Sequence, residues 1–133
     1  MLTRFPCNFF EVPFDSRMNR SLLIAEPIGG VNGQPLLVAT AHLESLNNSE
    51  LRMNQLQMSI DILSRTCKNN LMMGDFNFHS TWKDQQAVIH ENGYSDVYLD
   101  LKGGDETFTM LKTKRYDGWR PDKVILPVEG CYL

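Results

Sequence analysis

Two apolar runs, at residues 21–28 and 36–41, flank a short connection that is rich in Gly and Asn. Strand-length apolar runs on either side of such a connection predict an antiparallel hairpin. Neither run alternates cleanly between apolar and polar residues, which is typical of strands that are covered on both faces. The sequence therefore predicts a fold with a buried β-sheet at its centre.

A helical pattern follows the hairpin. Asn47 is placed to cap a helix, and Glu50 three residues later would complete a capping box. One apolar stripe recurs at helical spacing and is predicted to be buried: Met53, Leu56, Ile60 and Leu63. The polar residues of the same segment are expected mainly on its other faces: Arg52, Gln55 and Asp61.

The remaining segments add strands and a second helix. Strands are expected at residues 71–73, 106–111 and 122–128, and a short helix is expected at residues 82–89. Residues 1–20 are expected to be irregular, because the prolines there favour turns. Strands interspersed with helices predict a layered domain of the α/β or α+β class. The 133 residues contain no repeat and no linker, which predicts a single domain over residues 1–133.

Charge and composition exclude several classes of protein. The 13 basic and 16 acidic residues give a net charge of −3, which excludes a strong grip on nucleic acid through bulk charge but not chemistry on one phosphate. Three widely spaced cysteines indicate a reducing compartment rather than a disulfide framework or a zinc ribbon: Cys7, Cys67 and Cys131. No apolar run reaches the ~18 residues that a membrane span needs. We therefore expect no membrane partner and an intracellular location, in the nucleus or the cytoplasm.

Polar residues occur where the expected strands begin or end. His42 follows the second apolar run, and Asp122 opens the last one. Asp75 and Asn77 follow the third run two residues apart, so both would point to the same face of a strand that persists. Side chains at the carboxyl ends of strands in layered α/β sheets can converge on a ligand. These residues are therefore candidates for a site.

The pair Asp75 and Asn77 has two interpretations. A carboxylate can hold Mg²⁺ or deprotonate a metal-activated water, while a neighbouring amide orients the nucleophile or a phosphate oxygen. Gly-Asp-x-Asn is also ordinary turn chemistry, in which Asp and Asn bond to their own backbone. The residues alone favour the turn and leave the site open.

Six blocks of sequence follow one another along the chain in an order that can be compared with known families. They are Asn19-Arg20-Ser21-Leu22-Leu23, Ala39-Thr40-Ala41-His42-Leu43-Glu44-Ser45, the helix with Arg52 and Gln55-Leu56, Met73-Gly74-Asp75-Phe76-Asn77, Glu106-Thr107-Phe108-Thr109 and Arg120-Pro121-Asp122-Lys123-Val124-Ile125. Together, over residues 18–128, they resemble the endonuclease/exonuclease/phosphatase superfamily, the DNase I-like group of metal-dependent phosphoesterases. The His-Leu-Glu-Ser form is most similar to the tyrosyl-DNA phosphodiesterase 2 subfamily. The resemblance implies part of a four-layered α/β sandwich, with mixed sheets flanked by helices.

The resemblance also implies catalytic roles. His42 would contact the scissile phosphate, Asp75 would position or deprotonate the attacking water, and Asn77 would help orient water and phosphate. Asp75 and Asn77 would hold the metal cofactor, which is Mg²⁺ or, in its place, Mn²⁺. Asp122 would hold the imidazole of a partner histidine in its working tautomer.

Two residues are implied in substrate binding. Arg20 would line the site, and Phe108 would form an apolar wall beside the leaving group or base. The plainer alternatives are a surface arginine and a core phenylalanine. The implied function is that of a Mg-dependent phosphodiesterase or nuclease, in which an activated water attacks a phosphate ester of nucleic acid or of a 5′-tyrosyl-DNA adduct.

Three further polar or aromatic residues receive structural interpretations. We expect Glu44 to be structural or to belong to the helix entry. His79 is expected in a solvated loop, and Trp82 is expected to anchor its helix.

The sequence also departs from the superfamily pattern. A full domain is longer, carries a metal-binding Glu in its first half and ends in Ser-Asp-His, and neither block occurs here. The chain is therefore expected to be the central to C-terminal part of such a domain and to have severely reduced activity on its own. Two alternatives stay open: a non-catalytic truncated paralogue that serves as a binding module, and an inositol or lipid phosphatase of the same superfamily.

Overall fold

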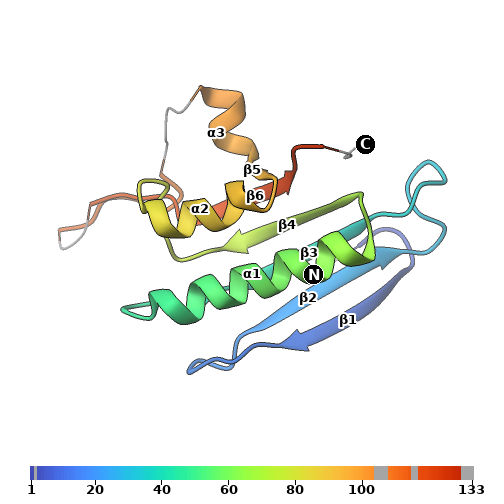
Figure 1. The fold of residues 1–133 in the computed structure, drawn as a ribbon, viewed down its shortest axis with the longest axis horizontal. Coiled ribbons are helices and arrows are strands. Elements are labelled where there is room, and N and C mark those ends of the chain that lie inside the picture. Colours follow the sequence, from blue (N-terminus) through green and yellow to red (C-terminus); the bar gives the residue numbers. More distant parts are fainter. Residues whose placement is uncertain (2, 104–107, 115–116, 130–133) are drawn as a thin grey trace.

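The computed structural model describes residues 1, 3–103, 108–114 and 117–129. Its elements are, in chain order, β1 (Cys7–Pro13), β2 (Ser21–Pro27), β3 (Leu37–His42), α1 (Ser49–Thr66), β4 (Asn70–Asp75), α2 (Lys83–Glu91), β5 (Tyr94–Asp96), α3 (Val97–Lys102) and β6 (Asp122–Pro127). The strands form one six-stranded sheet in the order β1-β2-β3-β4-β6-β5, which Figure 1 shows with its helices. The predicted α/β class is confirmed.

The sheet is mixed. β1, β2 and β3 form an antiparallel meander, so the predicted hairpin is confirmed. β3 and β4 are parallel, and α1 connects them, since parallel neighbours need a crossover that leads back to the same end of the sheet. β6 then pairs antiparallel with both β4 and β5.

One face of the sheet is covered by helices. α1 and α2 lie in front of the sheet in Figure 1. The core between the two layers includes Leu22 and Ile24 of β2, Leu37 and Ala39 of β3, Met72 of β4, Ile125 of β6, Leu56, Ile60 and Leu63 of α1 and Ile89 of α2. Full burial of one such Leu or Ile contributes about 1.5–3 kcal/mol, so this layer dominates the stability of the fold.

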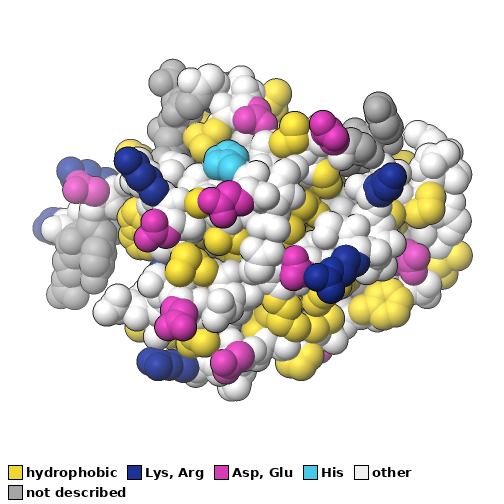
Figure 2. All heavy atoms as spheres, viewed as in Figure 1, with side chains coloured by type: hydrophobic (Ala, Val, Ile, Leu, Met, Phe, Trp, Pro, Cys, Tyr) yellow, Lys and Arg dark blue, Asp and Glu magenta, His cyan; other side chains and the backbone are white. Residues whose placement is uncertain are grey.

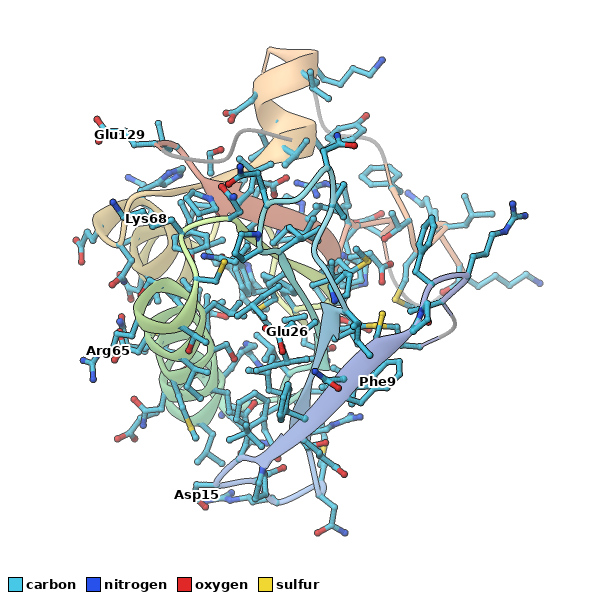
Figure 3. The ribbon with its side chains drawn as sticks, turned by 90° about the vertical axis from the view of Figure 1, so that its right-hand side faces the viewer. Phe9, Asp15, Glu26, Arg65, Lys68 and Glu129 are labelled. Atoms are coloured by element: carbon cyan, nitrogen blue, oxygen red, sulfur yellow. The ribbon has the colours of Figure 1, made fainter. Side chains whose placement is uncertain are left out.

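The other face of the sheet carries the alternate residues of the same strands. Register places Leu23, Thr40, Met73 and Val124 in one row across β2, β3, β4 and β6. None of the described helices covers this row, and Met73 and Val124 remain 37% and 38% exposed. In Figure 3, Phe9 of β1 lies on the side of the sheet away from α1. We call this surface the open face.

The prediction that residues 1–20 are irregular is wrong, because β1 lies within them. β1 is an edge strand that pairs along its whole length with β2, from Cys7 opposite Pro27 to Pro13 opposite Ser21. Proline is tolerated on an edge strand, where one ladder has no partner. Pro13 therefore ends the strand instead of preventing it.

The helix at residues 47–63 forms, but its details differ from the prediction. α1 begins at Ser49, its N-cap Asn48 makes no side-chain capping bond, and the capping box at Asn47 and Glu50 is wrong. The expectation that Arg52 and Gln55 lie on outer faces is also wrong, because both are buried. Their polar ends have partners inside the protein, which removes the cost of burying them.

The C-terminal third contains the other differences. β6 and α2 confirm the predicted strand and helix, whereas the short β5 and α3 were not predicted. Of the expected strand at 106–111, residues 106 and 107 lie outside the described part of the chain. The part that is described makes one isolated bridge, between Met110 and Trp119. A three-residue strand such as β5 is too short to show a periodic pattern.

Candidate active site

The two parallel strands at the centre of the sheet end side by side in polar residues. β3 ends at His42 and β4 ends at Asp75, and the register makes these two residues direct partners. Nε2 of His42 lies 3.5 Å from Oδ2 of Asp75, and their side chains are 49% and 28% exposed. An imidazole and a carboxylate thus meet at a solvent-accessible strand end, the arrangement that the sequence positions indicated.

A glycine fixes how closely these strand ends approach. Gly74 has φ of +142°, and a Cβ built on it would lie 2.0 Å from the carbonyl oxygen of Ala41. Only a residue without a side chain fits such contact with neighbouring backbone. Gly74 therefore allows β3 and β4 to pair immediately before His42 and Asp75.

Both interpretations of the Gly-Asp-x-Asn motif occur in the structure. Oδ1 of Asp75 accepts a hydrogen bond of 2.9 Å from the backbone N–H of Asn77, which is the turn chemistry. Oδ2 of the same carboxylate faces His42. Asn77 has a left-handed backbone with φ of 54°, and its amide Nδ2 donates to the carbonyl of Leu43 at 2.9 Å. Asn77 thereby ties the loop after β4 to the loop after β3 and keeps its amide oxygen as the atom that could bind a cation.

A cavity of about 410 Å³ opens beside these groups. Its lining comprises Asn19, Arg20, Ser21, Leu23, Thr40, Ala41, His42, Gly74 and Asp75. Leu23 and Thr40 belong to the open face, so the cavity lies at the end of that face and away from the helices. Arg20 makes one long contact, from Nη2 to the sulfur of Met18 at 3.8 Å. Residues that carry a guanidinium, an imidazole and a carboxylate therefore line one solvent-accessible space.

Three candidates do not belong to this cavity lining: Asn77, described above, Asp122 and Phe108. Asp122 is the register partner of Asp75 on β6 and is exposed, and its backbone carbonyl accepts a hydrogen bond of 3.1 Å from Arg120. Within the described ranges its carboxylate bonds to no histidine. Phe108 is 51% exposed, and its ring lies against Gly118. The structure therefore brings Arg20, His42 and Asp75 together at the cavity, attaches Asn77 to Asp75 by a hydrogen bond, and leaves Asp122 and Phe108 outside the lining.

The burial of a polar network around Glu44 was not predicted. Glu44 is fully buried, and so are Arg52 and Gln55 on α1. Burial raises the pKa of the Glu44 carboxyl, but hydrogen bonds from Ser16, Gln55 and the Arg17 N–H lower it by more, and its pKa lies below the ordinary value. The available signal was the i, i+3 spacing of Arg52 and Gln55, which continues the buried stripe of α1.

The surrounding loops hold the other residues that the sequence singled out. Nδ1 of His79 lies 2.9 Å from the hydroxyl oxygen of Thr81 within its own loop. Trp82 is the N-cap residue of α2, and its ring stacks on Trp119 with centroids 6.3 Å apart. The guanidinium of Arg52 lies 5.6 Å from the centre of the Trp82 ring. Trp82 thus joins α2 to α1 and to the loop before β6.

Comparison with known proteins rests on structure. No protein-family model and no curated protein matches the sequence. TDP2 from D. rerio, solved with a single-strand DNA product, is 26% identical over 91% of this chain, with a TM-score of 0.67. The human Nocturnin catalytic domain with bound sulfate is 18% identical over 92%, with a TM-score of 0.68. An endonuclease/exonuclease/phosphatase from Beutenbergia cavernae is 20% identical over 92%, with a TM-score of 0.70.

The fold is that of the DNase I-like endonuclease/exonuclease/phosphatase superfamily. The expected resemblance, including its proximity to the tyrosyl-DNA phosphodiesterase 2 subfamily, is confirmed at this level. Members of the superfamily are hydrolases that act on phosphate esters. This chain spans 53% of the D. rerio TDP2 chain, 48% of the Nocturnin domain and 38% of the Beutenbergia protein. It is thus equivalent to about half of a superfamily domain or less.

The donor set for a metal is small in this half of a superfamily domain. Among the residues that the structure describes, no group of three or more His, Cys, Asp or Glu side chains could hold an ion. Asp75 supplies one carboxylate to the cavity lining, and Asn77, whose backbone N–H donates to that carboxylate, offers one amide oxygen outside the lining. Mg²⁺ is commonly held by one or two carboxylates together with water and substrate phosphate oxygens. The residues present therefore fit a loosely held Mg²⁺ and not an ion enclosed by protein ligands.

Proposed function

We propose that this chain carries part of the active site of a metal-dependent phosphodiesterase or nuclease. The observation that carries the proposal is the cavity at which Arg20, His42 and Asp75 meet. Cationic and neutral N–H donors beside a carboxylate suit a phosphate ester under attack by water, because they stabilise the oxygens on which charge develops. The superfamily fold supports the same class of reaction.

Each residue has a defined part in the proposed reaction. Arg20 and His42 bind the non-bridging oxygens of the phosphate, and Asn77 helps to orient the water and the phosphate. The water oxygen forms the new bond to phosphorus, its proton passes to the Asp75 carboxylate, and the bond to the leaving oxygen breaks. Asp122 would hold the imidazole of a partner histidine in its working tautomer.

Metal dependence is part of the proposal. Mg²⁺, or Mn²⁺ in its place, would be held by the Asp75 carboxylate and the Asn77 amide oxygen. When bound, such an ion polarises the phosphate and lowers the pKa of a bound water. Omission of divalent cations, or addition of EDTA, is therefore expected to abolish turnover, and Mg²⁺ is expected to restore it.

Nucleic acid is the proposed substrate, with a 5′-tyrosyl-DNA adduct as the specific candidate. The single-strand DNA product bound by D. rerio TDP2 supports this substrate. The net charge of −3 argues against a grip on nucleic acid along a basic groove, and Figure 2 shows acidic and basic side chains interspersed on the helix-bearing face, which is the face away from the cavity. The substrate is therefore expected to be gripped at the phosphate beside Arg20 and not along a basic groove. Phe108 would then contact a base or leaving group that extends beyond the cavity.

The proposed compartment is the nucleus or the cytoplasm. Cys7 and Cys67 are free thiols, which suits a reducing environment. No helix in the described part of the chain is long and apolar enough to cross a bilayer.

The test compares Asp75→Asn with Asp84→Asn, an exposed carboxylate on α2 that serves as the matched control. We expect turnover of a 5′-phosphotyrosyl oligonucleotide to fall by at least about 100-fold in Asp75→Asn, because the proton acceptor is lost. The Asp84→Asn variant should retain its activity, and both variants should keep the wild-type circular dichroism spectrum.

The same assay separates the alternatives. Turnover of inositol or lipid phosphates in preference to DNA would overturn the nucleic-acid substrate and retain the phosphoesterase. Binding of the oligonucleotide without turnover of any phosphate ester, unchanged by Asp75→Asn, would identify a binding module.

A further inference from the structure

The loop that carries Arg20 is held by a buried carboxylate. Glu44 lies two residues after His42, where β3 ends, and its side chain is buried and does not line the cavity. Its Oε2 accepts a hydrogen bond of 2.6 Å from the Ser16 hydroxyl, and its Oε1 accepts one of 3.2 Å from the backbone N–H of Arg17. The Glu44 side chain thus holds Ser16 and Arg17, at the start of the loop that leads to Arg20 and β2.

The Ser16 hydroxyl extends this connection to Arg20. While it donates to Glu44, its oxygen accepts hydrogen bonds of 3.0 Å from the backbone N–H groups of both Met18 and Arg20. Hydrogen bonds in such a chain polarise and strengthen one another. The path from the carboxylate to the Arg20 backbone therefore contains two bonds and one bridging hydroxyl.

The opposite side of the carboxylate is anchored on α1. Nε2 of Gln55 donates to Oε2 of Glu44 at 3.3 Å and to the carbonyl of Asp15 at 2.9 Å, and its Oε1 accepts the backbone N–H of Glu44 at 2.8 Å. Figure 3 shows Asp15 at the turn between β1 and β2. Arg52 also donates to the backbone carbonyl of Glu44 at 2.7 Å. The site loop and the strand end thus share one rigid support.

We propose that Glu44 is the positioning residue of the candidate active site, which fixes the Arg20 loop relative to the strand end that bears His42. This inference rests on the proposed function, because it assigns the distance between the two phosphate-binding groups to a residue that touches no substrate. A carboxylate is required at this position, since three donors converge on its two oxygens and each needs an acceptor. A glutamine would direct its own NH₂ group at one or more of them.

The first test measures the loop without any assay of activity. Glu44→Gln is compared with Glu91→Gln, an exposed glutamate at the end of α2. We expect amide hydrogen exchange at Arg17, Met18 and Arg20 to accelerate by about tenfold in Glu44→Gln, because a net hydrogen bond is lost. Exchange in the centre of α1 should stay at the wild-type rate. Because the sulfur of Met18 lies 3.1 Å from the Ser45 hydroxyl oxygen, the methyl signal of Met18 should shift in carbon-13 NMR spectra.

The second test measures the consequence for phosphate binding. In assays of phosphodiester hydrolysis by Glu44→Gln we expect KM to rise by about tenfold while kcat changes by less than about threefold, because a binding group is misplaced and Asp75 is not. Glu91→Gln should leave both constants unchanged. Ser16→Ala removes the bridging hydroxyl and retains the carboxylate, and we expect the same loop exchange and the same KM effect. This second variant carries the test if Glu44→Gln does not fold.

Each outcome decides the inference. Wild-type exchange rates at Met18 and Arg20 in Ser16→Ala or in a folded Glu44→Gln would overturn it. A uniform rise of exchange through β3, β4 and α1 would also overturn it, since Glu44 would then support the whole fold equally. A chain that hydrolyses no phosphate ester but shows the local rise in exchange would overturn the proposed function and support the positioning of the loop.

Discussion

At the scale of single residues, the candidate site depends on a position without a side chain. Gly74 combines a backbone conformation that other residues rarely adopt with direct contact to the Ala41 carbonyl. A Cβ at position 74 would therefore clash with Ala41, and no side-chain rotation could relieve the clash, because the atoms in the way belong to the backbone of the neighbouring strand. The spacing of His42 and Asp75 thus depends on the glycine that precedes Asp75 on β4 and not only on the two polar groups themselves.

We expect Gly74→Ala to lower the free energy of unfolding by at least about 2 kcal/mol, from backbone strain and displacement of β3. Gly29→Ala is the matched control, because Gly29 has φ of +83° but no atom within 4 Å of a built Cβ. It should cost about 1 kcal/mol from its backbone conformation alone. Urea unfolding of both variants measures the difference, and equal costs would contradict the role given to the Ala41 contact.

Glu44 makes a pH-dependent contribution to stability. Its pKa in the folded protein lies below the ordinary value of 4.5, since hydrogen bonds from Ser16, Gln55 and the Arg17 N–H together with the charge of Arg20 outweigh the opposing effect of burial. A lowered pKa stabilises the fold fully above the unfolded value, and this stabilisation is lost as the pH falls through the folded value.

We therefore expect the difference in unfolding free energy between wild type and Glu44→Gln to be constant from pH 8 to about pH 5 and to shrink below pH 4.5. Urea unfolding at a series of pH values measures it. A difference that grows as the pH falls would show that the carboxyl is protonated more easily in the folded state than in the unfolded one.

At the scale of elements, α1 packs through a stripe that mixes apolar and polar residues. Its buried positions are Arg52, Gln55, Leu56, Ser59, Ile60 and Leu63. The apolar members could be predicted from helical spacing. The polar members could not, because their burial depends on partners distant in sequence, such as Gln85, whose Oε1 accepts a hydrogen bond of 2.7 Å from Arg52.

Replacement of Arg52 by methionine is expected to destabilise the protein by about 2–4 kcal/mol, because the buried carbonyl of Glu44 and the amide oxygen of Gln85 would lose their donors. Arg65→Met, at the exposed end of the same helix, should change stability by less than about 0.5 kcal/mol. Thermal and urea unfolding of both variants test this contrast. Equal effects of the two changes would mean that the buried hydrogen bonds of Arg52 contribute no more to stability than a surface charge.

The strands and the candidate site differ in how far they can be predicted from local sequence. The hairpin of β2 and β3 and the strand β4 follow from continuous apolar runs bounded by turn residues. β1 carries polar and aromatic residues beside prolines, so its strand character comes from pairing with β2. In the site, the meeting of His42 and Asp75 follows from their places at two strand ends. The approach of Arg20 does not, because it depends on the hydrogen bonds from Ser16 to a residue 28 positions away.

At the scale of the whole molecule, the sheet has one covered face and one open face. The open face presents Met73 beside Val124 and, on β1, Phe9 at 49% exposure. Contiguous exposed apolar surface on a sheet favours association with another apolar surface. The isolated chain is therefore expected to bind a hydrophobic dye and to self-associate.

The measurement compares wild type with the double change Met73→Gln and Val124→Thr. We expect both dye fluorescence and the sedimentation coefficient at high concentration to fall in the double variant. Leu101→Gln, at an apolar residue of α3 that is 78% exposed and outside the open face, should leave both unchanged. A wild-type chain that stays monomeric at about 100 μM and binds no dye would contradict the expectation.

The strand order determines when each strand can pair during translation. β5 pairs only with β6 among the described strands, yet β6 is made after it and lies between β5 and β4. During translation the first four strands and α1 can therefore assemble while β5 has no partner. Asp122, the register partner of Asp75, takes its place only when β6 enters the sheet, so β6 must leave the ribosome before β4 and β5 are joined through it.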